Sequence, residues 1–162
     1  MKKLIWLGVI LMSLVPLTVG AAATPGSWTD FTFNSYFYGN VLVMKATFTA
    51  GDAAAIPVKT PTDAEFAKIQ GYFLCYVGHD PGTTGPTNGA WDITLVGATT
   101  ARLDISGGAA TNLSSSVGQT YWVKDTGGTA GCQPILENFG ITITGNAVNS
   151  AVATIYLIFV RP

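Results

Sequence analysis

Acid–base chemistry near neutral pH would depend on His79, the one histidine of the chain. A histidine that acts as a general base needs a nucleophile and an orienting acid close to it. The sequence has no Gly-x-Ser-x-Gly elbow and no carboxylate pair at an informative spacing. We therefore interpret His79 as a solvated loop residue, and we predict no catalytic residues and no enzymatic activity.

Three aspartates could supply oxygen ligands to a calcium ion. Asp80 lies in a Gly-rich segment, and Asp92 and Asp104 fall in two short strands that could be neighbours. The spacing matches neither an EF-hand nor a dense Asp-x-Asp pattern, so caps on turns are the simpler interpretation. One histidine and two cysteines are too few ligands for a zinc site. We expect neither a metal nor another cofactor.

Cys75 and Cys132 are the two cysteines of the chain. In an exported protein, such a pair predicts a disulfide between distant strands or between a strand and a loop. Cys75 also lies inside the apolar run Tyr72–Val77, which leaves a buried thiol as the alternative.

Aromatic side chains could form a platform for stacking on sugar rings or on another protein. The six considered are Trp28, Tyr36, Tyr38, Trp91, Tyr121 and Trp122. In a β-sandwich most aromatics belong to the core, so we expect four of the six there, and Trp91 could point either way. The candidate binding surface is Trp91, Tyr121 and Trp122.

Residues 1–23 have the order of a secretory signal peptide. Lys2 and Lys3 precede the apolar run Leu4–Val15, and Ala21 and Ala23 form an A-x-A processing site. This predicts cleavage after Ala23 and a mature domain over residues 24–162, outside the cytoplasm. The alternative is an uncleaved anchor, because about 20 helical residues span a bilayer core of about 30 Å.

Charge is scarce and scattered along the chain. Charged residues make up 10% of the sequence, and the net charge is −1; without Lys2 and Lys3, six basic residues remain against nine acidic ones, giving −3. Nucleic-acid binding requires clustered Lys and Arg, so we expect no nucleic-acid partner. A neutral surface repels itself weakly, which suits either a subunit packed into an assembly or a secreted β-domain.

Alternating apolar residues and Gly-rich turns predict an all-β domain. We expect a β-hairpin over Trp28–Thr49 with its turn at Gly39–Asn40, a short helix within residues 62–71, and a loop over residues 79–89. The other predicted strands are Tyr72–Val77, Ala90–Val96, Ala101–Ile105, Thr120–Lys124, Ile135–Thr144 and Ala151–Val160. About eight strands with almost no helix indicate a single β-sandwich or flattened barrel.

The C-terminal strand is almost continuously apolar from Ile155 to Val160. We expect it to be central and buried on both faces. An apolar strand at an edge invites pairing with another chain, so completion of a neighbour's sheet is the alternative to pairing within its own domain.

Four segments carry a likeness to a known group: Gly71–Leu74, Pro86–Leu95, Leu103–Ala109 and Ile141–Ala151. In this order they resemble small β-rich structural proteins of the virions of tailed bacteriophages, over more than half of the chain. The resemblance implies a non-enzymatic β-domain on or near the phage head or tail. Trp91 stands where the pattern has a tyrosine. Phage subunits assemble in the host cytoplasm, so residues 1–23 are then an unusual assembly arm, or a cell uses the domain on its surface.

These observations favour a structural subunit of a virion or of a surface assembly. Its expected partners are copies of itself or a larger assembly, and residues 1–23, if uncleaved, would make its one contact with a membrane. The alternative is a secreted or periplasmic module that binds glycan or protein through exposed aromatics.

Overall fold

The computed structural model describes residues 23–97, 110–123 and 129–162. The described chain is mostly strand, which confirms the all-β class. The strands are β1 (Ser27–Trp28), β2 (Thr32–Tyr36), β3 (Val41–Thr49), β4 (Phe73–Pro81), β5 (Trp91–Gly97), β6 (Ala110–Leu113), β7 (Gln119–Trp122), β8 (Gln133–Pro134), β9 (Phe139–Thr144) and β10 (Val152–Val160). The helical segments are the 3₁₀ turns η1 (Phe37–Gly39) and η2 (Asp52–Ala54) and the helix α1 (Asp63–Ile69). Residues 1–22 and the predicted strand Ala101–Ile105 lie outside the described residues.

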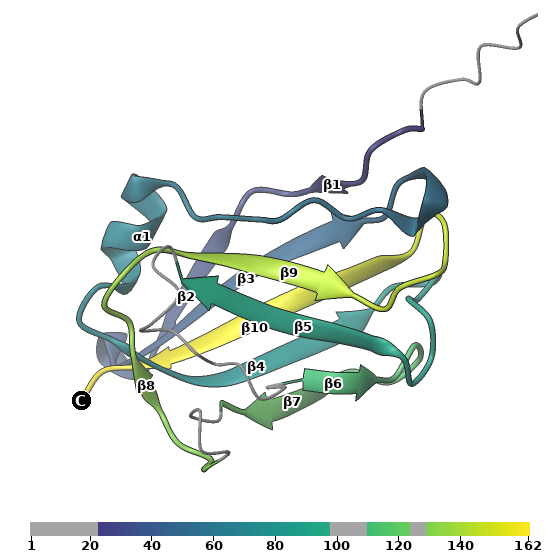
Figure 1. Ribbon diagram of the computed structural model, residues 1–162. Helices are drawn as coiled ribbons and strands as arrows, with labels where there is room; N and C mark the ends of the chain where they lie inside the picture. The colour runs from purple at the N-terminus through teal and green to yellow at the C-terminus, as the bar shows by residue number, and fades with distance from the viewer. Residues whose placement is uncertain (1–22, 98–109, 124–128) are drawn as a thin grey trace, which may run out of the picture.

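Two antiparallel sheets pack face to face (Figure 1). The large sheet has seven strands along the path β1-β3-β10-β4-β7, with β2 also on β3 and β8 also on β4. The small sheet has three strands in the order β6-β5-β9. Every pairing is antiparallel, as hairpins and Greek-key connections require.

The core lies between the inner faces of the two sheets. Period-two alternation places Met44 and Phe48 of β3, Leu157 and Phe159 of β10 and Trp91 of β5 inside, each almost without exposed surface. Burial of such a side chain contributes about 1.5–3 kcal/mol relative to its exposure to water. Packing between the sheets therefore dominates the stability of the domain.

Strand β10 is the centre of the large sheet. It pairs with β3 from Val152↔Thr49 to Val160↔Val41, and with β4 on its other side. The prediction of a central strand is thus confirmed, and pairing occurs within its own domain. Burial on both faces was a wrong expectation, because the small sheet covers one face and outward residues such as Tyr156 and Ile158 stay partly exposed.

Strand β4 runs further than the apolar pattern indicates. The predicted loop from residue 79 is wrong at its start, because His79, Asp80 and Pro81 belong to β4. They pair with β10 on one side, and His79 also pairs with Gln119 of β7 on the other. Neighbours on both sides extend the strand to Pro81, where it ends.

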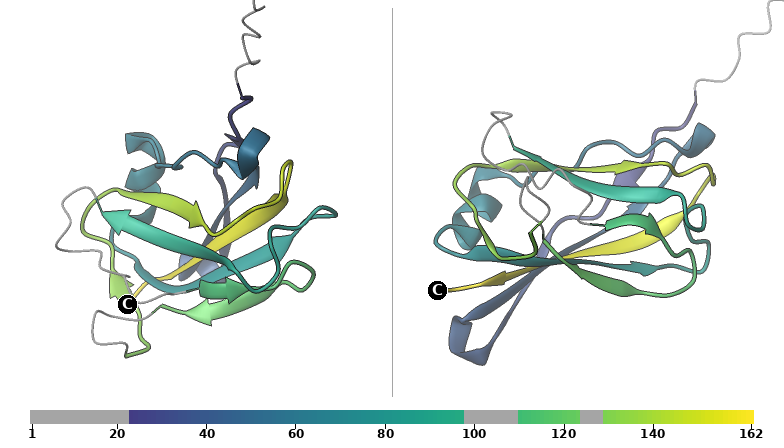
Figure 2. Two further views of the ribbon diagram at one scale, coloured as in Figure 1. Left: turned by 45° about the vertical axis from the view of Figure 1, so that its right-hand side comes forward. Right: turned by 60° about the horizontal axis from the view of Figure 1, so that its bottom comes forward.

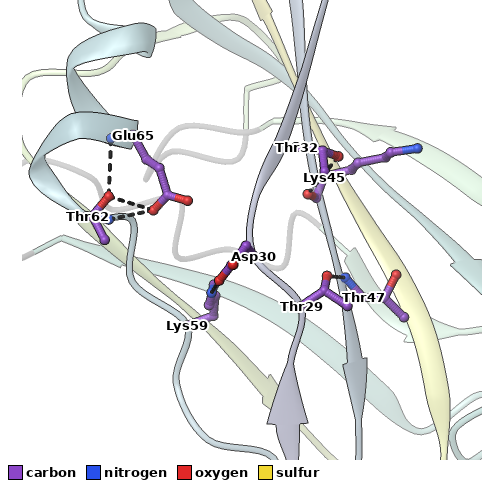
Figure 3. Close-up of polar contacts among 8 residues, drawn as sticks. All are labelled: Thr29, Asp30, Thr32, Lys45, Thr47, Lys59, Thr62 and Glu65. Atoms are coloured by element: carbon purple, nitrogen blue, oxygen red, sulfur yellow. Dashed lines mark hydrogen bonds and ion pairs between the residues drawn. The ribbon is translucent and has the colours of Figure 1, made fainter.

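Helix α1 follows the sequence signals closely. The Glu65 backbone N–H donates to Thr62 Oγ1 at 3.3 Å, and the Thr62 N–H donates to Glu65 Oε2 at 2.8 Å (Figure 3). This capping box satisfies two backbone donors that the first helical turn would otherwise leave free.

Candidate attachment surface

The β2–β3 hairpin carries three consecutive aromatic residues at its end, which we call the aromatic tip: Tyr36, Phe37 and Tyr38. Their exposed fractions are 51%, 76% and 108%, so Tyr38 is as accessible as in an extended chain. The hairpin projects beyond the body of the sandwich (dark blue, lower left of the right-hand view in Figure 2). Three neighbouring exposed aromatic rings form a contiguous patch, which makes the aromatic tip a candidate interaction site.

The backbone of the tip is strained. Phe37 has φ 51° and Tyr38 has φ 57°, the left-handed region that side chains with a Cβ adopt at a cost of about 1–2 kcal/mol per residue. Glycine or asparagine would occupy these positions more favourably, as Gly39 does at φ 88°. The chain therefore keeps two aromatics where the turn itself favours other residues, which points to a role beyond folding.

Four contacts hold the turn in place. The Asn40 N–H donates to the Phe37 carbonyl at 3.1 Å, and the Tyr72 hydroxyl donates to the Gly39 carbonyl at 2.7 Å. The Arg161 N–H donates to the Asn40 carbonyl at 2.8 Å, and the Arg161 guanidinium lies 4.6 Å from the centre of the Tyr72 ring. A tip fixed in this way loses less conformational entropy when a partner binds.

The base of the hairpin is polar and tied to the sheet. The Thr47 N–H donates to Thr29 Oγ1 at 2.9 Å, and Lys59 lies 3.9 Å from the fully exposed Asp30 carboxylate (Figure 3). An ion pair this exposed contributes little to the stability of the fold. Between Asp30 and Lys45 the sequence has no charged residue. The hairpin is therefore anchored at its base, and residues 31–44, which include its end, carry no charge.

The predicted surface of Trp91, Tyr121 and Trp122 does not form. Trp91 is fully buried, so its assignment to a binding surface is wrong. It faces inward at the start of β5, where its Nε1–H donates to the Ser114 carbonyl at 3.3 Å and its ring meets Phe48 edge to face. An indole whose N–H is satisfied inside the core has no reason to face solvent.

Tyr121 and Trp122 point to opposite faces of β7, as neighbours in a strand must. Tyr121 is partly buried and packs against the core, whereas Trp122 is 49% exposed and lies 4.2 Å from the Tyr76 ring, centre to centre. The expectation of four core aromatics among six is also wrong. Trp91 is the one fully buried, Trp28 and Tyr121 are partly buried, and the others are exposed.

Phe37, the centre of the aromatic tip, was not a candidate from the sequence. The sequence does contain a signal for it, because three consecutive aromatic residues come directly before the Gly39–Asn40 turn. Alternating strand residues face opposite sides, and residues inside a tight turn face neither sheet surface. Three consecutive aromatics beside a turn therefore cannot all reach one core.

His79 is buried, contrary to the expectation of a solvated loop residue. It is 2% exposed, and its ring centre lies 5.0 Å from that of Trp91 and 6.2 Å from that of Tyr121. Burial lowers the pKa of His79, while the Gln119 side chain and the Asp80 carboxylate partly oppose this. Neither ring nitrogen has a hydrogen-bond partner among the described residues. These surroundings favour a neutral imidazole that fills core volume.

The structure bonds Cys75 to Cys132, which confirms the predicted disulfide and contradicts the buried thiol. The bond joins β4 to the segment just before β8, across 57 positions of the chain. In the chain-entropy model, closing such a loop stabilises the fold by about 4 kcal/mol.

The structure describes two of the three candidate calcium ligands, and these lie in different sheets. Asp80 lies in β4 and not in a Gly-rich loop, Asp92 lies in β5, and Asp104 falls outside the described residues. Within residues 23–97, 110–123 and 129–162, no three His, Cys, Asp or Glu side chains lie close enough to share an ion. The same ranges contain no helix with the length and apolarity to cross a bilayer.

Comparisons of the chain with protein-family models, with curated proteins and with solved structures give no match. The resemblance to virion proteins therefore stays a prediction.

Proposed function

We propose that the chain is a non-enzymatic structural subunit of a virion-type or cell-surface assembly, and that it attaches to its partner through the aromatic tip. One observation carries this proposal: Phe37 and Tyr38 keep strained backbone conformations while their rings face solvent. Strain that does nothing for the fold is retained where it serves binding.

Other features support an attachment role. The uncharged end of the hairpin, within residues 31–44, avoids the desolvation cost that buried charges impose on an interface, and Tyr and Phe provide large contact area with few rotatable bonds. The disulfide suits a protein that works in an oxidising compartment, where thiols do not stay reduced.

Site-specific photocrosslinking in the producing cell tests the proposal without assuming a partner. A photoreactive phenylalanine analogue replaces Phe37, and the matched control carries it at Val117, which is 57% exposed in a separate loop. We expect a covalent adduct on irradiation of the Phe37 variant that the Val117 variant lacks. The absence of an adduct specific to position 37 would overturn the proposal.

A second candidate function is glycan binding, and one observation favours it. Trp122, half exposed, lies beside Tyr76 with the two rings tilted at 41°, and the pair presents an aromatic surface on the outer face of the large sheet. Calorimetric titration with soluble glycans tests it: binding that Trp122→Ala abolishes would support a carbohydrate module. If no glycan of a broad panel releases or absorbs heat on titration, the glycan-binding function is ruled out.

A further inference from the structure

Two exposed cationic side chains lie just behind the aromatic tip. The Arg161 guanidinium lies 4.6 Å from the centre of the Tyr72 ring, and the Tyr72 hydroxyl donates to the Gly39 carbonyl of the turn at 2.7 Å. The Lys68 ammonium lies 4.6 Å from the centre of the Phe33 ring, which belongs to β2 of the same hairpin. The hairpin end itself is uncharged, so exposed positive charge flanks an aromatic surface.

Acidic side chains of the same elements lie further from the tip. Both carboxylates of α1 belong to its first turn, whereas Lys68 belongs to its last. The last turn is the end nearer the tip, because the chain runs on from it to Tyr72, which contacts the turn of the hairpin. Asp30 comes before β2, a five-residue strand about 17 Å long, and so lies at the base of the hairpin. Among these groups, positive charge therefore gathers toward the end of the hairpin.

We propose that the aromatic tip inserts into the interface of an anionic lipid bilayer. This inference rests on the proposed function, because it names the partner of the same tip, and it adds a membrane contact to the one expected of residues 1–23. Tyrosine prefers the level of the lipid headgroups, where its ring is buried and its hydroxyl stays in water, and phenylalanine prefers the acyl boundary beneath. The tip holds Phe37 between two tyrosines, and Arg161 and Lys68 behind it meet the lipid phosphates.

The shape of the tip favours a lipid surface over a folded protein. The hairpin projects beyond the sandwich, and Phe37 and Tyr38 are exposed at 76% and 108% (Figure 2). A folded partner would need a matching concave pocket, whereas fluid lipid closes around a convex protrusion. Rings of about 150–250 Å² each, buried about 5–10 Å deep, give reversible binding that is far weaker than that of a membrane-spanning helix. The fixed turn presents the rings without further ordering.

Co-flotation with vesicles tests the inference on the purified exported protein. One set of vesicles is phosphatidylcholine, and the other is an equal mixture of phosphatidylcholine and phosphatidylglycerol. We expect the wild type to bind the mixed vesicles more tightly. Phe37→Asn with Tyr38→Asn should weaken this binding by about tenfold or more, because the apolar ring area is lost. The matched control Val117→Asn changes a position that is 57% exposed in a separate loop, and it should bind like the wild type.

Two further measurements separate insertion from simple attraction between charges. Lys68→Gln with Arg161→Gln should weaken binding to the mixed vesicles by about fivefold for each charge removed, and should leave binding to phosphatidylcholine unchanged. This variant keeps the Arg161 N–H, which donates to the Asn40 carbonyl and holds the turn. The fluorescence of Phe37→Trp should be quenched by lipids brominated in their acyl chains, whereas Val117→Trp should show no quenching beyond that of the wild type.

Each outcome decides the inference. A wild type that binds neither kind of vesicle, or both equally, overturns it. A tip variant that binds as well as the wild type also overturns it, because residues 1–23 or another segment then makes the contact. Equal quenching at positions 37 and 117 would refute insertion of the tip.

The two proposals fail separately. A photocrosslink from position 37 to a protein would leave the attachment role intact and refute the lipid partner, whereas an adduct with the mass of a lipid would support both. A Phe37 variant without any specific adduct would refute both.

Discussion

The imidazole of His79 lies beside the rings of Trp91 and Tyr121, and neither of its nitrogens has a hydrogen-bond partner among the described residues. Its neutral form suits this site, and the folded protein therefore binds a proton less readily than the unfolded chain. The lowered pKa makes stability depend on pH with a defined sign. Above the ordinary histidine pKa of about 6.5, neutral His79 makes its full contribution to the free energy of unfolding. That contribution is lost as the pH falls through this value toward the lower pKa of the folded state.

We predict that the free energy of unfolding decreases between pH 7.5 and pH 5 and that His79→Leu removes most of this decrease. Urea midpoints at the two pH values measure it. A leucine side chain is about as large as an imidazole and cannot ionise. The stability of His79→Leu at pH 7.5 therefore provides the control for the loss of packing. An equal decrease in both proteins would assign the pH dependence to other groups.

Replacing the tip aromatics should not destabilise the fold. Asparagine adopts the left-handed region more easily than phenylalanine or tyrosine, and exposed rings lose little packing when removed. We predict that Phe37→Asn with Tyr38→Asn leaves the free energy of unfolding unchanged or raises it by about 1 kcal/mol. Chemical denaturation measures it, and a loss of several kcal/mol would mean that the rings support the hairpin itself.

Residue types alone do not decide which aromatics face solvent. Trp91 and Trp122 both sit in short alternating strands, yet one is buried and the other half exposed. Their directions depend on the register of β5 against β9 and of β7 against β4, which is set by long-range pairing. The partnership of Cys75 with Cys132 was predictable because two cysteines allow one intramolecular pairing.

Sequence signals were sufficient to predict the elements whose residues lie close together in the chain. The β2–β3 hairpin follows from alternation around a turn, and α1 follows from its N-cap, its acidic first turn and the glycine after it. The end of β4 could not be predicted from the sequence, because His79 and Asp80 become strand residues only by pairing with β10 and, for His79, with β7. Strand propensity depends mainly on packing against neighbouring strands, which a single segment of sequence does not reveal. A wrong boundary at the end of β4 is therefore expected.

The central position of β10 predicts what its removal would do. Each of its nine residues pairs with β3, and most pair with β4 as well. A chain that ends at Ser150 would split the large sheet into two unconnected parts and expose the core. We predict an unfolded or aggregated product, measured by circular dichroism and light scattering. A soluble, folded remnant would contradict the central role of β10.

For the whole molecule, the disulfide joins the last third of the chain to the middle of the large sheet. Cys75→Ala with Cys132→Ala should lower the free energy of unfolding by about 4 kcal/mol, because the unfolded chain regains the entropy of an open loop. Denaturation of the oxidised wild type and of the double variant measures it. Wild type under reducing conditions is the control and should resemble the variant.

The start of the described chain is fixed at the end of the sandwich opposite the hairpin (Figures 1 and 2). The Thr24 N–H donates to Asp52 Oδ2 at 2.8 Å, and the Asp52 N–H donates to the Thr24 carbonyl at 2.9 Å, beside η2. Strand β3, nine residues and so roughly 30 Å long, separates the two ends. The first described residues and the aromatic tip therefore lie at opposite ends of β3, about one sandwich length apart.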